Sequence, residues 1–139
     1  MASIPEILQQ AKSVAVVGYS AKPARASHWI SDYLEDHGLR VYRVNPVMDS
    51  TPDRPIYASL ADLPEAVDIV DIFRAPPHVP AIVEAAIAAG AKTVWMQPGA
   101  ENPDAAVIAE AAGLNAVVGN CIYREHKAVF NVEDDRGQH

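Results

Sequence analysis

The residues best suited to chemistry lie in one loop, from Gly18 to Ser27, which also contains Ser20, Lys22 and Arg25. Glycine allows the backbone to turn tightly and to approach a ligand closely. A helix that begins near Ser27 directs its free N–H groups and positive dipole at a phosphate, and the two basic side chains add charge beside it. The loop therefore predicts a pyrophosphate site. A flexible connector with solvated basic side chains is the alternative.

The end of the second expected strand bears on which nucleotide is bound. The dinucleotide fingerprint G-x-G-x-x-G is absent after Gly18, and a nicotinamide site also requires an acidic residue where this chain has Asn45. Arg43, two residues earlier, favours a ligand with an additional phosphate. NADP or the 3′-phosphate of coenzyme A (CoA) fits this pattern better than NAD.

Two further residues follow expected strands, and each has two interpretations. Arg74 either lines the same cleft or pairs with a carboxylate such as Asp71 or Glu84. Cys121 lies at the rim of the cleft in one interpretation, where its thiol meets the thiol end of a cofactor and forms a mixed disulfide under oxidation. In the other it is a small buried residue, which is the commoner fate of a lone cysteine.

No recognised catalytic or metal-binding pattern appears in the sequence. It has no G-x-S-x-G elbow, no Walker loop and no paired catalytic carboxylates. The histidines lack i, i+4 partners and no C-x-x-C accompanies them, so we expect no metal site. Cys121 and His126 could act together on a thioester only if the C-terminal segment folds back, because nucleophile and base must come within hydrogen-bond reach.

Apolar runs that alternate with helical patterns position these loops. Strands are expected at 13–17, 39–44, 67–73, 93–96 and 115–118. Helices are expected at 4–11, with a capping box at Ser3 and Glu6, at 28–37, with Ser27 as its N-cap, and at 59–63, 79–89 and 102–112, and the segment after 121 is unassigned. This alternation predicts an α/β fold with a doubly wound parallel sheet of about five strands, in the order 3-2-1-4-5, and helices on both faces. Ligands bind such sheets at the carboxyl ends of the strands, where the strand order reverses.

Bulk properties exclude several classes of protein. The 139 residues suit a single domain, with its core at about 4–128 and a polar tail at 129–139 that frays at its end. The net charge of −7 argues against an extended nucleic-acid surface, and one cysteine allows no internal disulfide. No signal peptide and no apolar run of membrane-spanning length are visible, so we expect a cytoplasmic protein.

Several short motifs occur together and in chain order, which makes the set more specific than any one of them. They are Val16–Ser20, the Pro23-x-Arg25-x-Ser27 loop, Val44-Asn45-Pro46, Val67–Arg74, Trp95-Met96-Gln97 and Asn120-Cys121-Ile122. The set resembles the stand-alone CoA-binding domain proteins, the YccU-like group. Their fold is similar to the N-terminal domain of the succinyl-CoA synthetase α subunit. The resemblance covers residues 4 to 128.

The resemblance implies a Rossmann-like domain that binds CoA or an acyl-CoA. The residues it carries over are Gly18, Tyr19, Ser20, Lys22, Arg25, Ala26 and Ser27 at the phosphates, Asn45, Pro46, Phe73 and Arg74 beside the nucleotide, Gln97 and Gly99 along the pantetheine arm, and Asn120 and Cys121. This sequence departs from the family pattern at Ala26, where the family often has proline, and at Lys22, where asparagine is common.

The synthetase also needs a second domain with a phosphorylated histidine and a β subunit, neither of which this chain contains. The resemblance therefore implies binding without turnover, as a carrier, a sensor, a homodimer or a partner of another enzyme subunit, with no nucleic-acid or membrane partner. Two alternatives stay open. One is an NADP(H)-binding redox protein or sensor, and the other is an acyl-CoA enzyme that uses Cys121.

Overall fold

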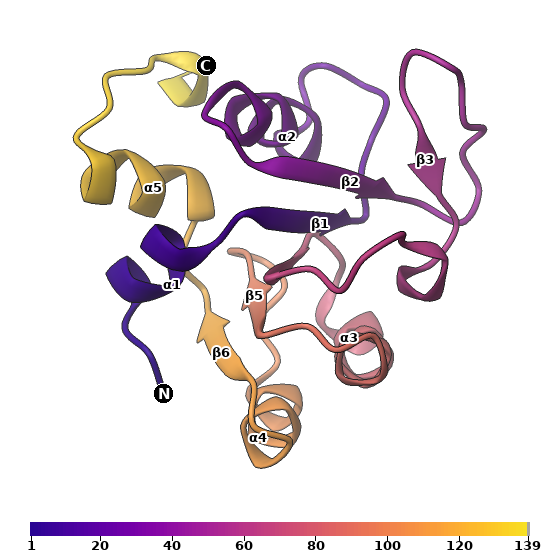
Figure 1. Ribbon diagram of the computed structural model, residues 1–139, viewed down its shortest axis with the longest axis vertical. Coiled ribbons are helices and arrows are strands. Elements are labelled where there is room, and N and C mark those ends of the chain that lie inside the picture. The colour runs from indigo at the N-terminus through magenta and orange to yellow at the C-terminus, as the bar shows by residue number, and fades with distance from the viewer. Residues whose placement is uncertain (139) are drawn as a thin grey trace.

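A parallel sheet forms the centre of the protein in the computed structural model, which describes residues 1–138. Its six strands lie in the order β3-β2-β1-β4-β5-β6 (Figure 1). Their bounds are Ser13–Val17 for β1, Arg40–Val44 for β2, Ile56–Tyr57 for β3, Ile69–Ile72 for β4, Thr93–Met96 for β5 and Asn115–Val118 for β6. The order reverses between β1 and β4, so the carboxyl ends of these two strands mark the expected ligand site.

The α/β class and the doubly wound parallel sheet are confirmed, and the strand numbers follow 3-2-1-4-5 with a sixth strand added. The residues at one edge differ from the expectation, which placed 67–73 beside 39–44. The two-residue strand β3 was not expected, because Ile56–Tyr57 is too short to give a periodic pattern. It occupies the edge beside β2, and the segment expected as the third strand, 67–73, is β4 and pairs directly with β1.

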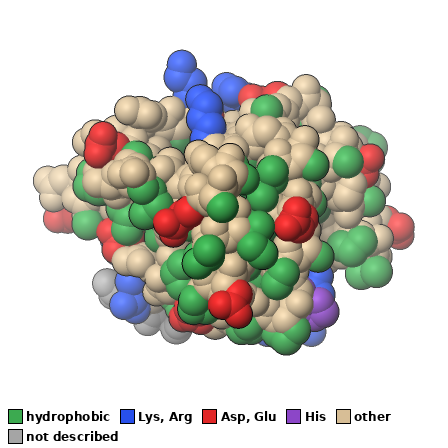
Figure 2. Space-filling model, turned by 90° about the horizontal axis from the view of Figure 1, so that it is seen from below, with side chains coloured by type: hydrophobic (Ala, Val, Ile, Leu, Met, Phe, Trp, Pro, Cys, Tyr) green, Lys and Arg blue, Asp and Glu red, His purple; other side chains and the backbone are tan. Residues whose placement is uncertain are grey.

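Helices cover both faces of the sheet. Helices α1 (Ile4–Gln10), α2 (Ala26–Asp36) and α5 (Ile122–Phe130) pack on one face, and α3 (Val79–Ala88) and α4 (Pro103–Ala111) pack on the other (Figure 1). Single 3-10 turns occur at Leu60–Asp62, Pro76–His78 and Arg136–Gln138. Seen from below, the molecule shows scattered hydrophobic and acidic side chains (Figure 2). No helix in residues 1–138 is long and apolar enough to cross a membrane.

The central strands are buried on both sides, as their sequences indicate. Val14, Ala15 and Val16 of β1 are completely buried, because neighbouring side chains point alternately into the two helical layers. The α1 helix begins with the expected capping box, in which the Ser3 hydroxyl and the Glu6 carboxylate each accept a hydrogen bond from the backbone N–H of the other residue.

Several expected bounds differ from the structure by one or two residues, and the helix expected at 59–63 is a single 3-10 turn. Helix α2 begins at Ala26 with Arg25 as its N-cap, so the expectation of Ser27 as N-cap is wrong. The unassigned segment after Cys121 is helix α5. In the tail expected to fray, the Arg136 guanidinium pairs with Asp36 of α2, and the last residue of that tail, 139, lies outside the described residues.

Candidate functional site

Gly18 begins the loop after β1 and has a backbone conformation that few other residues adopt. Its φ is +89°, in the left-handed region, and its N–H donates a hydrogen bond of 3.1 Å to the carbonyl of Val44. A Cβ atom at this position would lie 2.5 Å from the carbonyl oxygen of Phe73. Glycine is therefore required, because the ends of β1, β2 and β4 converge on this point.

The rest of this loop folds against the start of α2. The Ser27 hydroxyl accepts a hydrogen bond of 3.0 Å from the N–H of Ser20, and the Ser20 hydroxyl accepts one of 3.2 Å from the N–H of Lys22. Arg25, the N-cap, makes no side-chain cap bond. Within the described chain, the N–H groups of Ala26 and Ser27 have no recorded acceptor, so the positive end of α2 is open to an anion.

A cavity of about 350 Å³ lies over this loop, and we call it the loop pocket. It is lined by Gly18, Ser20, Lys22, Arg25, Ala26, Ser27 and Phe73. The lining includes two cations and no acid, and both cations are exposed. Together with the open helix end, this composition suits a diphosphate.

A second cavity of about 220 Å³ adjoins the first, and we call it the apolar pocket. It is lined by Ala26, Trp29, Ile30, Phe73, Gln97, Pro98, Cys121, Tyr123, Arg124 and Gly137. Ala26 and Phe73 belong to both linings, so the two pockets share a wall. Their volumes together fall within the range of roughly 300–1,000 Å³ that is usual for a small-molecule site.

Two hydrogen bonds fix the start of α5, beside which Cys121 lies. The buried Gln97 side chain accepts a bond of 3.0 Å from the N–H of Ile122, which satisfies a free donor of this helix. The indole N–H of Trp95 donates to the carbonyl of Asn120 at 2.7 Å. These contacts hold the half-buried Cys121 on the wall of the apolar pocket.

Nine of the residues expected at the site line one of these pockets, and six do not. The six outside them are Tyr19, Asn45, Pro46, Arg74, Gly99 and Asn120. Asn45 instead joins two loops, because its amide donates to the carbonyl of Tyr19 at 2.9 Å and accepts from the N–H of Val47. Gly99 donates its N–H to the carboxylate of Glu101.

Arg43 is not free to bind a phosphate, in contrast to its expected role. It is 5% exposed and forms ion pairs with Asp32 at 3.0 Å and Glu35 at 3.1 Å. Arg54 lies in the same cluster and is more exposed, with one guanidinium nitrogen 2.5 Å from the hydroxyl of the buried Tyr19. Internal carboxylates therefore neutralise the charge that the sequence assigned to a ligand.

Asp71 does not pair with Arg74, which was one of the two interpretations of that arginine. Asp71 is completely buried and neither carboxylate oxygen has a hydrogen-bond partner. Burial raises the pKa of Asp71 well above its usual range, because burial penalises the charged form. Arg74 forms no ion pair in the described part of the chain, and its side chain passes beside Gly18.

Sequence reasoning missed most of the apolar pocket. The residues not anticipated are Trp29, Ile30, Pro98, Tyr123, Arg124 and Gly137. A signal existed for the first two, because they stand three and four positions after Ala26 and therefore share one helix face. No sequence signal identified Gly137, because this residue lies far along the chain from the others that line the pocket. Within residues 1–138, no group of His, Cys, Asp and Glu side chains is arranged to hold a metal.

Comparison with known proteins gives relatives of two sizes. The chain is 34% identical to the uncharacterized protein YneT of Bacillus subtilis, over 90% of this chain and 93% of that protein. It is 29% identical to an ADP-forming acetate–CoA ligase of Archaeoglobus fulgidus, over 80% of this chain but 18% of the ligase. A solved structure of a hypothetical protein from Pyrococcus horikoshii is 40% identical, with a TM-score of 0.87 over 91% of this chain and 89% of that one.

A family model described as the CoA binding domain matches residues 12–127, which include both pockets apart from Gly137. The match extends from the start of β1 into α5, so it covers the whole sheet. The chain therefore belongs to the CoA-binding domain family, as its ordered motifs indicated.

Proposed function

We propose that this protein binds CoA or an acyl-CoA, with the diphosphate in the loop pocket and the pantetheine arm in the apolar pocket. The observation that carries the proposal is the shared wall of Ala26 and Phe73, which joins a basic cavity to an apolar one that reaches Cys121. CoA has the same sequence of chemical properties, from an anionic diphosphate through an uncharged arm to a thiol.

Membership of the CoA-binding domain family supports this ligand over other nucleotides. The ligase among the relatives is named for a reaction with CoA, and this chain corresponds to 18% of its length. We therefore propose for this chain the binding of the family's ligand, CoA, and not the ligation reaction of the larger protein. In this chain the bound CoA would be carried, sensed or presented to a partner subunit.

An NADP(H) site is the second candidate, and Arg43 was the residue that favoured it. Because Arg43 is buried against two carboxylates, it adds no positive charge for the 2′-phosphate of NADP or for the 3′-phosphate of CoA, so it no longer favours either ligand. The glycines of the dinucleotide fingerprint are also missing after Gly18. We therefore rank this candidate below CoA.

Catalysis by Cys121 and His126 is the third candidate, and the surroundings of the histidine weaken it. His126 is 5% exposed, and its Nδ1 lies 2.7 Å from the Tyr33 hydroxyl. Burial, with a smaller effect of His37, lowers the pKa of His126 to about 4. The described residues provide no hydrogen bond between His126 and Cys121 that would activate the thiol.

Isothermal titration of the purified protein with CoA, acetyl-CoA and NADPH tests the proposal. We expect saturable binding of both CoA species and much weaker binding of NADPH. Phe73→Ala, which removes part of the shared wall, should weaken CoA binding at least about tenfold, or about 1.4 kcal/mol. Absence of CoA binding would refute the proposal, and tight NADPH binding without CoA would put the second candidate first. Hydrolysis of acetyl-CoA during long incubation would favour the third.

A further inference from the structure

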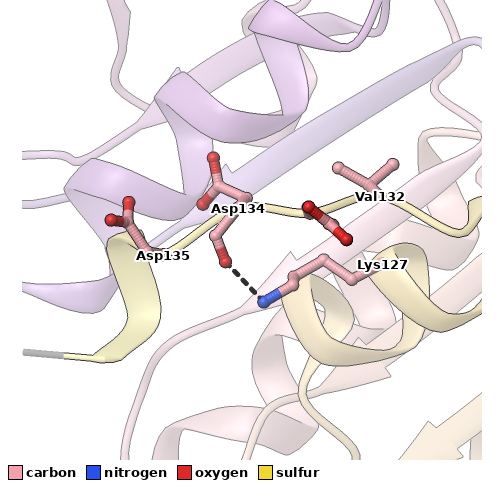
Figure 3. A pocket seen from close by; sticks show the side chains of 5 residues that line it. Lys127, Val132, Asp134 and Asp135 are labelled. Carbon is pink, nitrogen blue, oxygen red and sulfur yellow. Dashed lines mark hydrogen bonds between the residues drawn. The ribbon is translucent and has the colours of Figure 1, made fainter.

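The C-terminal segment Asp134–Gly137, which we call the strap, lies across α2 and α5 near the apolar pocket. In Figure 1 this segment follows α5 and ends beside α2. The Tyr123 hydroxyl lies 2.9 Å from both the carbonyl and the carboxylate of Asp134. The Lys127 ammonium donates to the same carbonyl at 2.6 Å, as the dashed line in Figure 3 shows. One end of the strap is therefore bound to α5.

Arg136 binds the strap to α2. Its guanidinium donates to the carboxylate of Asp36 at 2.9 Å and to that of Asp134 at 3.0 Å. The same group lies 5.4 Å from the ring centroid of the buried Tyr33. This is a cation–π contact, so Arg136 joins the strap to α2 through both charge and ring face.

Gly137 is held tightly against two walls of the apolar pocket. Its N–H donates to the Tyr123 hydroxyl at 3.2 Å. A Cβ atom at Gly137 would overlap the Tyr123 ring and lie 3.2 Å from the Trp29 ring. Tyr123, Trp29 and Gly137 all line the cavity that contains Cys121, whereas none of them lines the loop pocket. The strap thus forms a side of the apolar pocket that the loop pocket does not share.

We infer that the strap limits the size of the group on the CoA sulfur, so that the site accepts the free thiol or a short acyl group and excludes long acyl chains. The inference rests on the proposed function. The cavity of about 220 Å³ has the volume of about seven water molecules at roughly 30 Å³ each. A pantetheine arm fills such a space, and a long acyl chain gains further buried contact beside the strap only if that wall moves. The strap is the last segment of the described chain, and the side chains of Tyr123, Lys127 and Asp36 hold it to α5 and α2.

Selectivity between CoA and octanoyl-CoA tests this inference. Wild-type protein should bind CoA and acetyl-CoA at least tenfold more tightly than octanoyl-CoA, measured by titration below the micelle concentration. Arg136→Ala should reduce that ratio about tenfold, because it releases the strap from Asp36 and Tyr33, while the affinity for CoA changes little. Arg40→Ala is the matched control, because it also removes an exposed arginine ion pair, with Glu65, and should leave the ratio unchanged.

A second variant makes the test independent of Arg136. Gly137→Ala should also reduce the ratio, because the added methyl group displaces the strap from Tyr123. An unchanged ratio in both variants, with CoA still bound, would overturn the inference and leave the proposed function intact. A wild-type protein that binds octanoyl-CoA as tightly as CoA would also overturn it. Absence of CoA binding in the wild type would refute the proposed function, and the inference with it.

Discussion

The amino ends of the strands (the amino edge) and the loop pocket at their carboxyl ends (the carboxyl edge) differ in how their cations are paired. At the amino edge, the carboxylate of Asp68 accepts from the N–H of Lys12 at 2.7 Å and pairs with the Lys92 ammonium at 3.3 Å. Arg40, at the start of β2, pairs there with Glu65. At the carboxyl edge, Lys22 and Arg25 line the loop pocket without an ion pair in the described chain. Near the carboxyl end of β2, Arg43 is also paired, with Asp32 and Glu35, and it lines neither pocket.

The difference shows how one sheet divides stability and binding. At the amino edge, the hydrogen bonds of Asp68 hold the starts of β1 and β4 together. Because the charges there are paired, they attract a charged ligand only weakly. Lys22 and Arg25 form no ion pair with the described residues, so their charges are free to pair with an anion bound in the loop pocket. We therefore expect substitutions at the amino edge to change stability alone, and those at the carboxyl edge to change binding.

The largest effect should come from two matched glycine substitutions, one at each edge. Gly18 and Gly113 both have φ of +89°, but a Cβ atom meets the Phe73 carbonyl at Gly18 and nothing within 4 Å at Gly113. Gly113→Ala should cost about 1–2 kcal/mol of unfolding free energy from backbone strain. Gly18→Ala should cost about 3 kcal/mol or more, because the overlap adds to that strain. Urea denaturation measures both.

The affinity for CoA should also distinguish the Gly18→Ala and Gly113→Ala variants. At a temperature where both are folded, Gly113→Ala should bind CoA like the wild type, and Gly18→Ala should bind much more weakly, because the loop pocket includes Gly18. Equal losses of stability would show that the close approach of β1 and β4 is relaxed in solution. Equal CoA affinities would show that the ligand binds away from this loop.

The next effect concerns Asp68 and the pH dependence of stability. Burial raises the pKa of Asp68, but the N–H of Lys12 and the Lys92 ammonium lower it more, so the net shift is downward. The carboxylate therefore stabilises the folded state above its unfolded pKa of about 4, and this contribution is lost as the pH falls through the folded pKa. Asp68→Asn should cost about 1–3 kcal/mol at pH 7, as hydrogen bonds to a charged group do.

Urea denaturation between pH 7 and pH 2.5 measures this contribution. The difference in unfolding free energy between wild type and Asp68→Asn should shrink as the pH falls below about 4. Asp49→Asn, at an exposed position, is the control and should change little at any pH. A constant difference across the range would mean that the charge of Asp68 does not stabilise the fold, and a change in CoA affinity would contradict the division between the edges.

The sequence predicted the sheet and one of the two pockets for a physical reason. Strand burial and helix periodicity are local, so β1, β4 and the loop after Gly18 could be located from a few residues each. The role of Arg43 was wrong because its partners Asp32 and Glu35 lie on α2, and strand position alone does not show them. Gly137 was missed because packing of the strap on Tyr123 is a long-range contact without a sequence pattern.

The smallest effect should come from single cations, and it separates the edges most directly. Arg25→Ala removes a charge from the loop pocket and should weaken CoA binding about tenfold at low salt, or about 1.4 kcal/mol, with little change in stability. The effect should decrease at high salt, because the exposed guanidinium is screened from the phosphates. Arg40→Ala, the matched change at the amino edge, should leave CoA affinity unchanged at either salt concentration. If both variants weakened binding equally, net charge would account for the loss, and the unpaired cations of the carboxyl edge would have no local role.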